Sequence, residues 1–520
     1  MRGPQSRLNF LSVLPSWALI GLLFCFPLGF LLVKAIWILP KSADWEAGYV
    51  LRLVGVTVGQ ALISACLSGL VGTGGAFFYS ELRLPLRRLF WKFSFVCFSL
   101  PTVLVALTLI SWFGKVFAMV GGEPYWFSGW IAIFVAHTFL NFPLFVRTVG
   151  NRLLLMDRNP EKVALSLGAS RFQTFRWVTW KRIRPSVSAA FFLSFLYCSS
   201  SFILLLLLGG GPRFTTLEVA IYRAIRVDLD IELAVRFAFI QWLISLVVFF
   251  LAGRGEQQNT AEIGSGEFFS IYRFRNSRSN AWVWFGYLLC LSLFTLAPLL
   301  NLLMSAASGL AQVDVASVAS AFWKSAVLAA AVGLLTSVIV FPLVRFHHLK
   351  PRSRLLEWLY HSPSAVSTLV LTLSWWVTYP LVLQQRMGNV VAVGLIQSLM
   401  AFPLIYRIIT DGFSLLALRH YQTARTLGAS PGQIFWWVEL PSLKSTLILA
   451  WVAGAVFSLG EVTSLLLFAP TDFETLTFGI YRRMARYEFG EAYVMGALLL
   501  MGMIGLLQWG SYWDTKTHDA

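Results

Sequence analysis

Apolar residues form long runs along this chain, and charged residues gather in short clusters between those runs. A helix needs about 20 residues to cross a hydrocarbon core of roughly 30 Å. Runs of that length predict an all-α membrane protein with about twelve spanning helices. The twelve segments are 16–39, 53–79, 90–113, 127–149, 186–208, 232–253, 281–307, 322–345, 356–382, 388–409, 446–468 and 490–512.

The first of these runs has an alternative interpretation as a secretory signal, because the chain starts with the basic sequence MRGPQSR. Signal peptides carry an apolar region of about 7–15 residues and a small-residue cleavage site. The run here exceeds 20 residues, and no such site follows it. We therefore expect a retained first span.

Composition supports a bilayer as the solvent of this chain. Hydrophobic residues make up 57% of it and charged residues 12%, and its mean hydropathy is +0.71, which leaves too little polar surface for a soluble globule. All five cysteines lie inside the apolar runs. We therefore expect neither a disulfide framework nor a metal site, and no cofactor is indicated.

The net charge of +17 would suggest nucleic acid as a partner in a soluble protein, but its distribution along the spans argues otherwise. If the N-terminus is cytoplasmic, 28 of the 41 Lys and Arg residues fall in the segments on the cytoplasmic side. The positive-inside rule produces this asymmetry in multi-pass membrane proteins. We predict that both termini are cytoplasmic and that the chain does not bind nucleic acid.

The chain contains an internal repeat. Residues 142–178 align with residues 402–438 at a constant offset of 260, with 14 identities in 37 positions. A second match, at an offset of 259, aligns FTTLEVAIYR (214–223) with FETLTFGIYR (473–482). Two halves with six spans each face the same way in the membrane. The predicted domains are a first half at 1–253, a cytoplasmic linker at 254–280 and a second half at 281–520.

Both halves carry the tetrapeptide LGAS in a loop that the charge count assigns to the cytoplasm. Gly168 can end one short helix in a left-handed conformation, and Ser170 can cap the next helix in a capping box with Gln173. Gly428, Ser430 and Gln433 repeat this arrangement in the second half, where Pro431 occupies the first helical position.

These helix–bend–helix elements have two possible roles. Each could be a connector between spans. Their presence at equivalent positions in both halves instead favours a pair of docking elements for two copies of one partner, with Ala164 and Ala424 providing a small-residue face.

The sequences KVALSLGASRFQTFRWVTWKRIRP and QTARTLGASPGQIFWWVELPSLKS resemble the coupling-loop motif of bacterial ATP-binding cassette (ABC) importers. The resemblance implies a type I ABC importer permease fold and docking onto two copies of a separate cytoplasmic ABC ATPase subunit. It also implies that the permease is not itself an enzyme. The docking positions that it implies are Lys162, Val163, Ala164 and Gly168 in the first half, and Gln422, Thr423, Ala424 and Gly428 in the second. The glutamate of the motif is replaced by Lys162 and Gln422.

A narrower resemblance concerns the cargo. LGGGPRFTTLEVAIYRAIRVDLD (208–230), followed by FIQ (239–241), resembles the fused two-half permeases of bacterial thiamine and thiamine-pyrophosphate importers. This resemblance implies a periplasmic substrate-binding protein as a further partner, and inward transport of thiamine or its phosphates across the bacterial inner membrane. The alternative is an ABC importer permease for ferric iron or another small solute.

Other classes of protein lack their sequence signatures in this chain. No G-x-x-x-x-G-K-[ST] phosphate-binding loop and no H-E-x-x-H zinc motif occurs. An ion-coupled secondary transporter is a less favoured alternative, because it would typically carry several intramembrane carboxylates.

Glu461 is the one obvious intramembrane carboxylate, and its counterpart region in the first half reads CSSSF (198–202). It could be a structural pair near a helix end, or it could line the translocation pathway and attract the cationic thiazolium ring of thiamine. The Trp375–Trp376 pair suggests a cation–π contact, but aromatic residues in spans usually serve packing.

Overall fold

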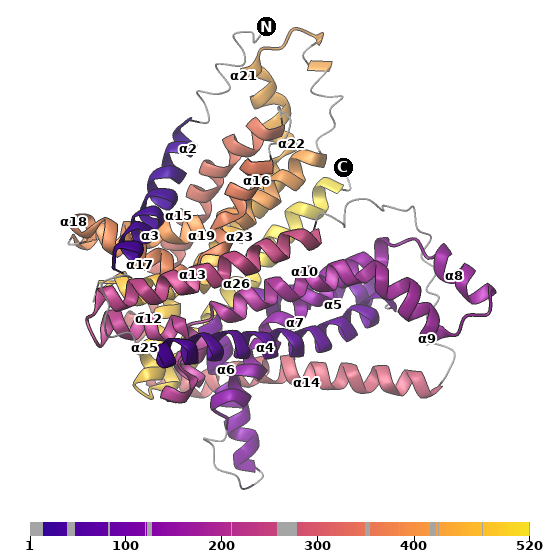
Figure 1. The fold of residues 1–520 in the computed structure, drawn as a ribbon, viewed down its shortest axis with the longest axis horizontal. Helices are drawn as coiled ribbons and strands as arrows, with labels where there is room; N and C mark the ends of the chain where they lie inside the picture. Colours follow the sequence, from indigo (N-terminus) through magenta and orange to yellow (C-terminus); the bar gives the residue numbers. More distant parts are fainter. Residues whose placement is uncertain are drawn as a thin grey trace. The chain divides into compact units, whose positions relative to one another are not determined.

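The computed structural model describes residues 14–38, 47–81, 84–119, 121, 127–209, 211–256, 278–348, 354–383, 385–415, 423–424, 426–470 and 472–518. Across these residues the regular secondary structure is entirely helical, as Figure 1 shows. A helix satisfies its backbone hydrogen bonds internally, which the hydrocarbon core of a membrane requires. The predicted all-α class is confirmed.

Nine helices in the described part of the chain are long and apolar enough to cross a membrane. A tenth candidate is the bent pair Gly432–Ser442 and Lys444–Gly460, whose two parts meet at 66°. Two predicted segments, 186–208 and 356–382, do not meet these criteria. The first begins in a helix whose initial turns carry Lys181, Arg182 and Arg184, and the second is divided by a 3₁₀ turn.

Helix breaks account for the difference between these ten candidates and the twelve predicted spans. A run of apolar residues can be continuous in the sequence although the helix that it forms is interrupted. The predicted segment 90–113 crosses such a break at Leu100–Pro101, and proline disfavours a helical conformation in the residue before it. The twelve-segment prediction therefore located the apolar runs but not the helix ends.

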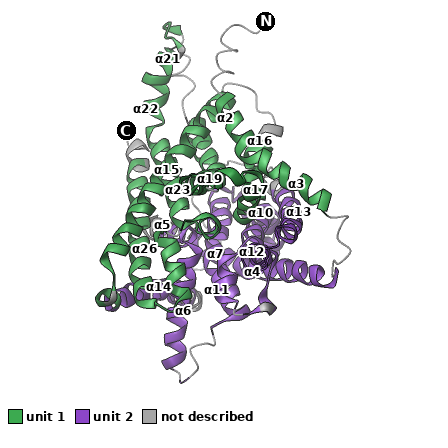
Figure 2. Cartoon of the chain, turned by 90° about the vertical axis from the view of Figure 1, so that its left-hand side faces the viewer, with its two compact units in different colours: residues 1–40, 309–520 green, residues 41–308 purple. Residues whose placement is uncertain are grey.

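The described chain forms two compact units, coloured separately in Figure 2. One unit comprises residues 41–308 and the other residues 1–40 with 309–520. This division differs from the predicted halves at 1–253 and 281–520, which describe the sequence repeat and stay a prediction. Most of the predicted linker at 254–280 lies outside the described residues.

Unit 2, residues 41–308, is built around the long helices α4, α7, α10 and α13, of which α4, α7 and α10 all pack against one another (Figure 1). Its elements are α4 (Ala47–Glu81), α5 (Leu84–Ser99), α6 (Thr102–Met119), α7 (Gly129–Leu155), α8 (Asn159–Ser166), α9 (Arg171–Thr174), η4 (Phe175–Thr179), α10 (Trp180–Ser199), α11 (Ile203–Leu208), η5 (Pro212–Phe214), α12 (Leu217–Arg226), α13 (Ile231–Glu256) and most of α14 (Arg278–Gly309).

Unit 1 has a similar core, in which α15, α19 and α23 pack against one another. Its elements are α2 (Leu14–Ile20), η1 (Gly21–Cys25), α3 (Phe26–Ile38), η7 (Leu310–Gln312), α15 (Val315–His348), α16 (Arg354–His361), η8 (Ser362–Ala365), α17 (Thr368–Thr378), α18 (Pro380–Leu383), α19 (Arg386–Leu415), α21 (Pro431–Ile434), η9 (Phe435–Glu439), α22 (Leu440–Ser442), α23 (Lys444–Gly460), α24 (Thr463–Phe468), α25 (Leu476–Ala485) and α26 (Phe489–His518).

The first spanning helix of each sequence half packs in the unit formed mainly by the other half. In unit 1, the indole Nε1 of Trp375 donates to the carbonyl of Leu23 at 2.9 Å. In unit 2, Tyr287 of α14 donates through its hydroxyl to the carbonyl of Val71 at 2.9 Å. The two halves therefore exchange their first helices, which the sequence repeat alone does not reveal.

Glycines allow the central helices of each unit to approach closely. A Cβ atom on Gly72 of α4 would lie 2.4 Å from the carbonyl oxygen of Phe142 in α7, and one on Gly333 of α15 would lie 2.5 Å from that of Trp451 in α23. Small residues at helix crossings permit this packing in membranes. Larger side chains at Gly72 or Gly333 would force the helices apart.

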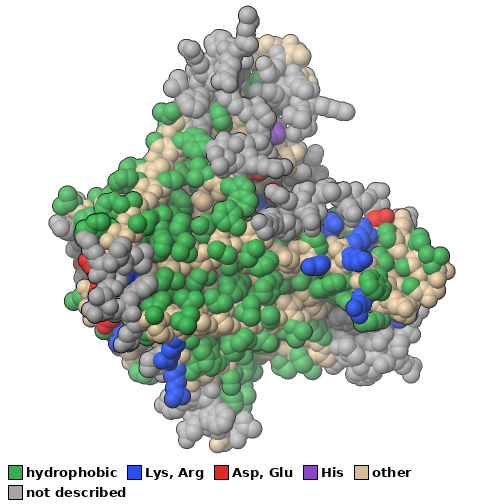
Figure 3. Space-filling view, viewed as in Figure 1, with side chains coloured by type: hydrophobic (Ala, Val, Ile, Leu, Met, Phe, Trp, Pro, Cys, Tyr) green, Lys and Arg blue, Asp and Glu red, His purple; other side chains and the backbone are tan. Residues whose placement is uncertain are grey.

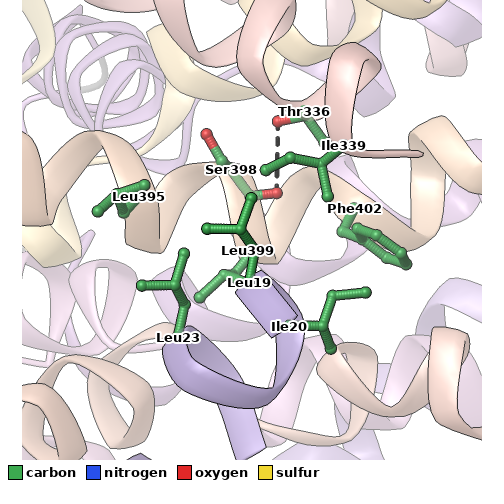
Figure 4. A pocket seen from close by; sticks show the side chains of 9 residues that line it. All are labelled: Leu19, Ile20, Leu23, Thr336, Ile339, Leu395, Ser398, Leu399 and Phe402. Atoms are coloured by element: carbon green, nitrogen blue, oxygen red, sulfur yellow. Dashed lines mark hydrogen bonds between the residues drawn. The ribbon is translucent and has the colours of Figure 1, made fainter. Parts of the chain in front are cut away.

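A small apolar cavity lies in unit 1 beside α2, η1, α15 and α19 (Figure 4). Its volume is about 10 Å³, which is at the lower limit for a single water molecule. Thr336 donates to the carbonyl of Ser398 across it at 3.4 Å. The cavity is too small for a transported solute, so it is a packing feature.

Candidate functional site

The two LGAS loops have the bend that the sequence predicts. Gly168 and Gly428 have φ angles of +88° and +81°, in the left-handed region that favours glycine. At the first bend, Ala169 N–H donates to the carbonyl of Ala164 at 3.1 Å and Gly168 N–H to that of Leu165 at 3.1 Å. These two bonds are a Schellman motif, which closes the C-terminus of α8.

The predicted capping boxes are also present. Gln173 N–H donates to Ser170 Oγ at 3.2 Å, and Ser170 N–H donates to Gln173 Oε1 at 2.8 Å. In the second loop the corresponding bonds of Gln433 and Ser430 measure 3.3 and 2.7 Å. Helix α21 begins at Pro431, as predicted. The local geometry of both loops was therefore predictable residue by residue.

The docking positions implied by the coupling-loop resemblance lie on accessible surface. Lys162, Val163 and Gly168 are exposed, and Ala164 is partly exposed. In the second loop Thr423 and Gly428 are exposed and Ala424 is partly exposed, whereas Gln422 lies outside the described residues. Their role in docking stays a prediction.

One pair of surface residues at these bends escaped the sequence prediction. Leu167 and Leu427 directly precede the glycines, and each side chain is 81% exposed. A single exposed leucine is common on protein surfaces, but this pair occupies equivalent positions of the two repeats. Both belong to the LGAS tetrapeptide, so the repeated sequence itself was the available signal.

An open groove of about 510 Å³ accompanies the second loop. Ser430, Gly432, Gln433, Trp436 and Trp437 line it, and the two tryptophans are 63% and 79% exposed. The capping box holds one wall of this groove in place. The loop therefore presents an open, partly aromatic surface.

A π-helical turn follows each capping box and leads into the next membrane helix. These turns, η4 and η9, start 260 residues apart, so they occupy the same position in the repeat. Single π-helical turns inside longer helices are frequent at functional sites. Each ends at a buried residue, Thr179 in η4 and Glu439 in η9.

The two buried residues anchor their turns differently. Thr179 donates to the carboxylate of Glu161 in α8 at 2.5 Å, and Arg158 pairs with the same carboxylate at 3.1 Å. Glu439 instead accepts from Arg345 of α15 at 2.6 Å. Each loop thus has one buried carboxylate, which ties η4 to α8 in unit 2 and η9 to α15 in unit 1.

Neither anchoring carboxylate was a predicted site residue. Glu161 is fully buried and Glu439 is 2% exposed. The acid position of the motif aligns with Lys162, and Glu161 lies one residue earlier. Burial of a charged side chain usually requires a partner, and in both cases that partner becomes visible in the three-dimensional structure.

Glu461 lies at the break between α23 and α24. Its carboxylate accepts hydrogen bonds from Thr463 N–H at 2.5 Å and from the Thr368 hydroxyl at 3.3 Å, which caps the first turn of α24. Ser201 occupies the equivalent break between α10 and α11. Glu461 therefore has a structural role as a cap of α24. A role in the translocation pathway stays a prediction.

The break in unit 2 is held by two glutamines that the sequence analysis did not single out. Helix ends leave carbonyl groups without intrahelical partners. Gln60 of α4 donates to the carbonyl of Cys198 at 2.8 Å, and Gln241 of α13 donates to that of Ser199 at 3.1 Å. Both glutamines are fully buried, so they stabilise an interrupted helix inside the bundle.

The predicted aromatic pair serves packing. Trp375 is 3% exposed and is bonded to the backbone of Leu23, and Trp376 stacks on Phe468 with ring centroids 5.8 Å apart.

These features define an integral membrane component of a transport system. The chain belongs to the family described as "Binding-protein-dependent transport system inner membrane component", whose model matches residues 68–258 and 344–510. The repeated, all-helical fold is the type I ABC importer permease fold that the sequence predicts, and the protein is a multi-pass protein of the inner membrane.

Named relatives show what the chain resembles more closely. It is 28% identical to the thiamine transport system permease protein ThiP of Haemophilus influenzae over 91% of both chains. It is 27% identical to the ThiP protein of Escherichia coli over 88% of both chains. The sulfate transport system permease protein CysT of Synechococcus elongatus is 31% identical, but the match covers 33% of this chain and 63% of that protein.

Proposed function

We propose that this chain is the permease subunit of an ATP-driven importer that moves thiamine, its phosphates or both inward across the bacterial inner membrane. The observation that carries the proposal is the match to relatives named as thiamine permeases over about nine tenths of their length. The sulfate permease matches a third of the chain. Full-length similarity therefore favours thiamine as the cargo over sulfate, ferric iron or another small solute.

The partners follow from the twin loops. Two bends with left-handed glycines, matching bonds from Ala169 to Ala164 and from Ala429 to Ala424, and the same capping box suit two copies of one cytoplasmic ATPase subunit. The exposed Leu167 and Leu427 would supply an apolar contact to each copy. A periplasmic binding protein would deliver the cargo to the opposite side, with both termini in the cytoplasm. Lipids surround the spanning helices.

The anchored π turns, η4 and η9, would couple ATP hydrolysis in the partner to movement of the spanning helices. ATP binding and hydrolysis in the partner would move the bends, and the anchors at Thr179 and Glu439 would pass that movement to α10 and to α22 with α23. Alternating access then follows if the spanning helices respond as rigid elements. Glu461, at the break that follows α23, is the proposed pathway residue for the cationic ring of thiamine.

Co-purification tests this proposal. The chain expressed with the neighbouring ATPase and binding protein should be isolated as a complex with two ATPase copies. The binding protein should bind thiamine or a thiamine phosphate in a ligand screen. Binding of Fe³⁺ with no response to thiamine would overturn the cargo assignment while leaving the permease assignment intact.

Membership in a binding-protein-dependent family argues against the ion-coupled secondary transporter. Such a transporter would drive substrate uptake with the downhill movement of an ion and would not need ATP. Thiamine uptake that an ionophore abolishes at constant ATP would support that alternative.

A further inference from the structure

The junction of η4 and α10 carries a cationic and aromatic surface that the proposed coupling role does not use. It consists of Arg176, Trp177, Trp180, Lys181 and Arg184, named here the η4–α10 basic face. Trp177 is 60% exposed and Trp180 is 38% exposed, and the three cationic side chains are exposed as well. Figure 3 shows Lys and Arg side chains gathered near the start of α10, beside hydrophobic side chains.

Two of these cations are held against one tryptophan. Arg176 Cζ lies 5.6 Å from the centroid of the Trp177 ring, and Lys181 Nζ lies 5.2 Å from it. Both distances are within the range of cation–π attraction. Both positive charges are therefore held at the Trp177 ring.

No carboxylate in the described part of the chain forms an ion pair with Arg176, Lys181 or Arg184. The nearby acidic residues are already engaged. Glu161 is buried against Thr179 and Arg158, and Asp157 accepts a hydrogen bond from Asn159 N–H at 3.0 Å. The face thus has positive charge that no carboxylate among the described residues pairs with.

The second repeat keeps only one of these three charges. At an offset of 260, Arg176 corresponds to Trp436, Lys181 to Pro441 and Arg184 to Lys444. Lys444 packs over the ring of Trp513 at 5.0 Å. A surface required by two identical ATPase copies should appear in both repeats, so its restriction to one repeat argues for a different ligand.

We propose that the η4–α10 basic face binds the headgroup of an anionic phospholipid, such as phosphatidylglycerol, at the membrane surface around the first repeat. Tryptophan is enriched at the level of lipid headgroups, and clustered Lys and Arg residues beside a spanning helix recognise anionic lipids. The guanidinium groups suit bidentate phosphate binding. The aliphatic stem of Lys181 can lie along the apolar surface while its ammonium group reaches the phosphate.

The test compares lipid retention in the whole importer complex, delipidated and then incubated with equimolar phosphatidylglycerol and phosphatidylcholine. Native mass spectrometry counts the lipids that stay bound. The wild-type complex should prefer phosphatidylglycerol about tenfold, and Arg176→Gln/Lys181→Gln/Arg184→Gln should lose most of that preference. The control Arg213→Gln/Arg226→Gln/Arg486→Gln removes the same charge from other exposed positions and should keep it.

A second variant separates lipid binding from folding. Arg176→Lys/Arg184→Lys keeps the charge and should keep the preference for phosphatidylglycerol, with weaker retention because the bidentate geometry is lost. Equal retention in the wild-type and triple-glutamine complexes would overturn the proposal. So would displacement of the lipid by millimolar glycerol phosphate, because the face would then be a site for soluble phosphates.

The ATPase subunit is the other partner that could bind the η4–α10 basic face. If the triple-glutamine variant lowers ATPase affinity in vesicles of pure phosphatidylcholine, where anionic lipid is absent, the face belongs to the ATPase and the lipid proposal fails. We expect unchanged affinity there. The inference does not depend on the cargo, so its failure would leave the thiamine assignment standing.

Discussion

The carboxylate of Glu439 accepts a hydrogen bond from Arg345 Nε at 2.6 Å, which joins the end of η9 to the last turn of α15. Arg345 also lies over the ring of Phe435, at the start of the same π turn, with its Cζ 5.1 Å from the ring centroid. In the other repeat, position 179 is a threonine bonded to Glu161 of α8. Equivalent positions of the repeat are thus bonded to different elements, α8 in one repeat and α15 in the other.

We predict that the Arg345–Glu439 pair is needed for coupling in the second repeat. Arg345→Gln or Glu439→Gln should each destabilise the protein by about 1–3 kcal/mol, because a buried partner loses its bond. Each should also lower the stimulation of ATPase activity by the loaded binding protein. The double variant should be no worse than either single variant. Additive losses in this double-mutant cycle would show that the two side chains act separately.

The matching prediction for the first repeat concerns Glu161. Thr179→Val removes the hydroxyl that binds this carboxylate, and it should weaken coupling while Arg158 still pairs with Glu161. Thr179→Ser, which keeps the hydroxyl, is the control and should couple normally. If valine and serine give the same ATPase stimulation, this hydrogen bond does not transmit movement.

Topology can be tested with single cysteines in a chain without its native cysteines. Ser166→Cys and Thr426→Cys lie at equivalent exposed positions of the two loops, and Val227→Cys and Arg486→Cys lie at exposed positions after α12 and α25. We expect impermeant thiol reagents to label the first pair from the cytoplasmic side and the second pair from the periplasmic side. Labelling of 166 and 426 from opposite sides would contradict a parallel repeat.

The local features of the loops were predictable because they depend on residues close in sequence. The left-handed conformation of Gly168 and the box between Ser170 and Gln173 involve neighbours within one or two helical turns. Glu439 and Arg345 are separated by 94 residues, and no periodicity in the sequence pairs them. The exchanged first helices escaped prediction for the same reason.

Hydropathy alone predicted neither the ends of the spanning helices nor the breaks within them. Hydropathy records where apolar residues occur, and it is insensitive to a break such as the one at Glu461, where a carboxylate caps α24 within an apolar stretch. The glutamines Gln60 and Gln241, which hold the corresponding break in unit 2, are single polar residues in long helices. Their partners are backbone carbonyls, which leave no trace in the sequence.

Substitutions at Glu461 separate its capping role from its charge. Glu461→Gln keeps an oxygen that can accept from Thr463 N–H, so folding should change little, and uptake of cationic thiamine should fall because the negative charge is lost. Glu461→Ala removes the cap as well and should cost about 1 kcal/mol of stability. Melting temperature and initial uptake rates measure the two effects. Normal thiamine uptake by the glutamine variant would show that Glu461 acts only as a helix cap and that its charge is not needed for transport.

The bends themselves are tested by Gly168→Val and Gly428→Val. A Cβ atom at either position meets no atom within 4 Å, so the expected cost of about 1–2 kcal/mol comes from the left-handed backbone. Insertion should persist while ATPase binding weakens, more so for Gly428→Val because Pro431 stiffens that loop. Gly502→Val, at a glycine outside the loops that has no positive φ angle and where an added Cβ meets no atom within 4 Å, is the control for added bulk.

The most direct measurement is ATP-driven accumulation of labelled thiamine in vesicles that contain the complete importer, with loaded binding protein outside and ATP inside. The account predicts accumulation that requires both ATP and binding protein and that disappears in Gly168→Val/Gly428→Val at normal protein levels. Accumulation by the double variant at the wild-type rate would mean that the loops are connectors. An absence of thiamine uptake by the wild-type complex, with ATP hydrolysis stimulated by another loaded cargo, would contradict the proposed function.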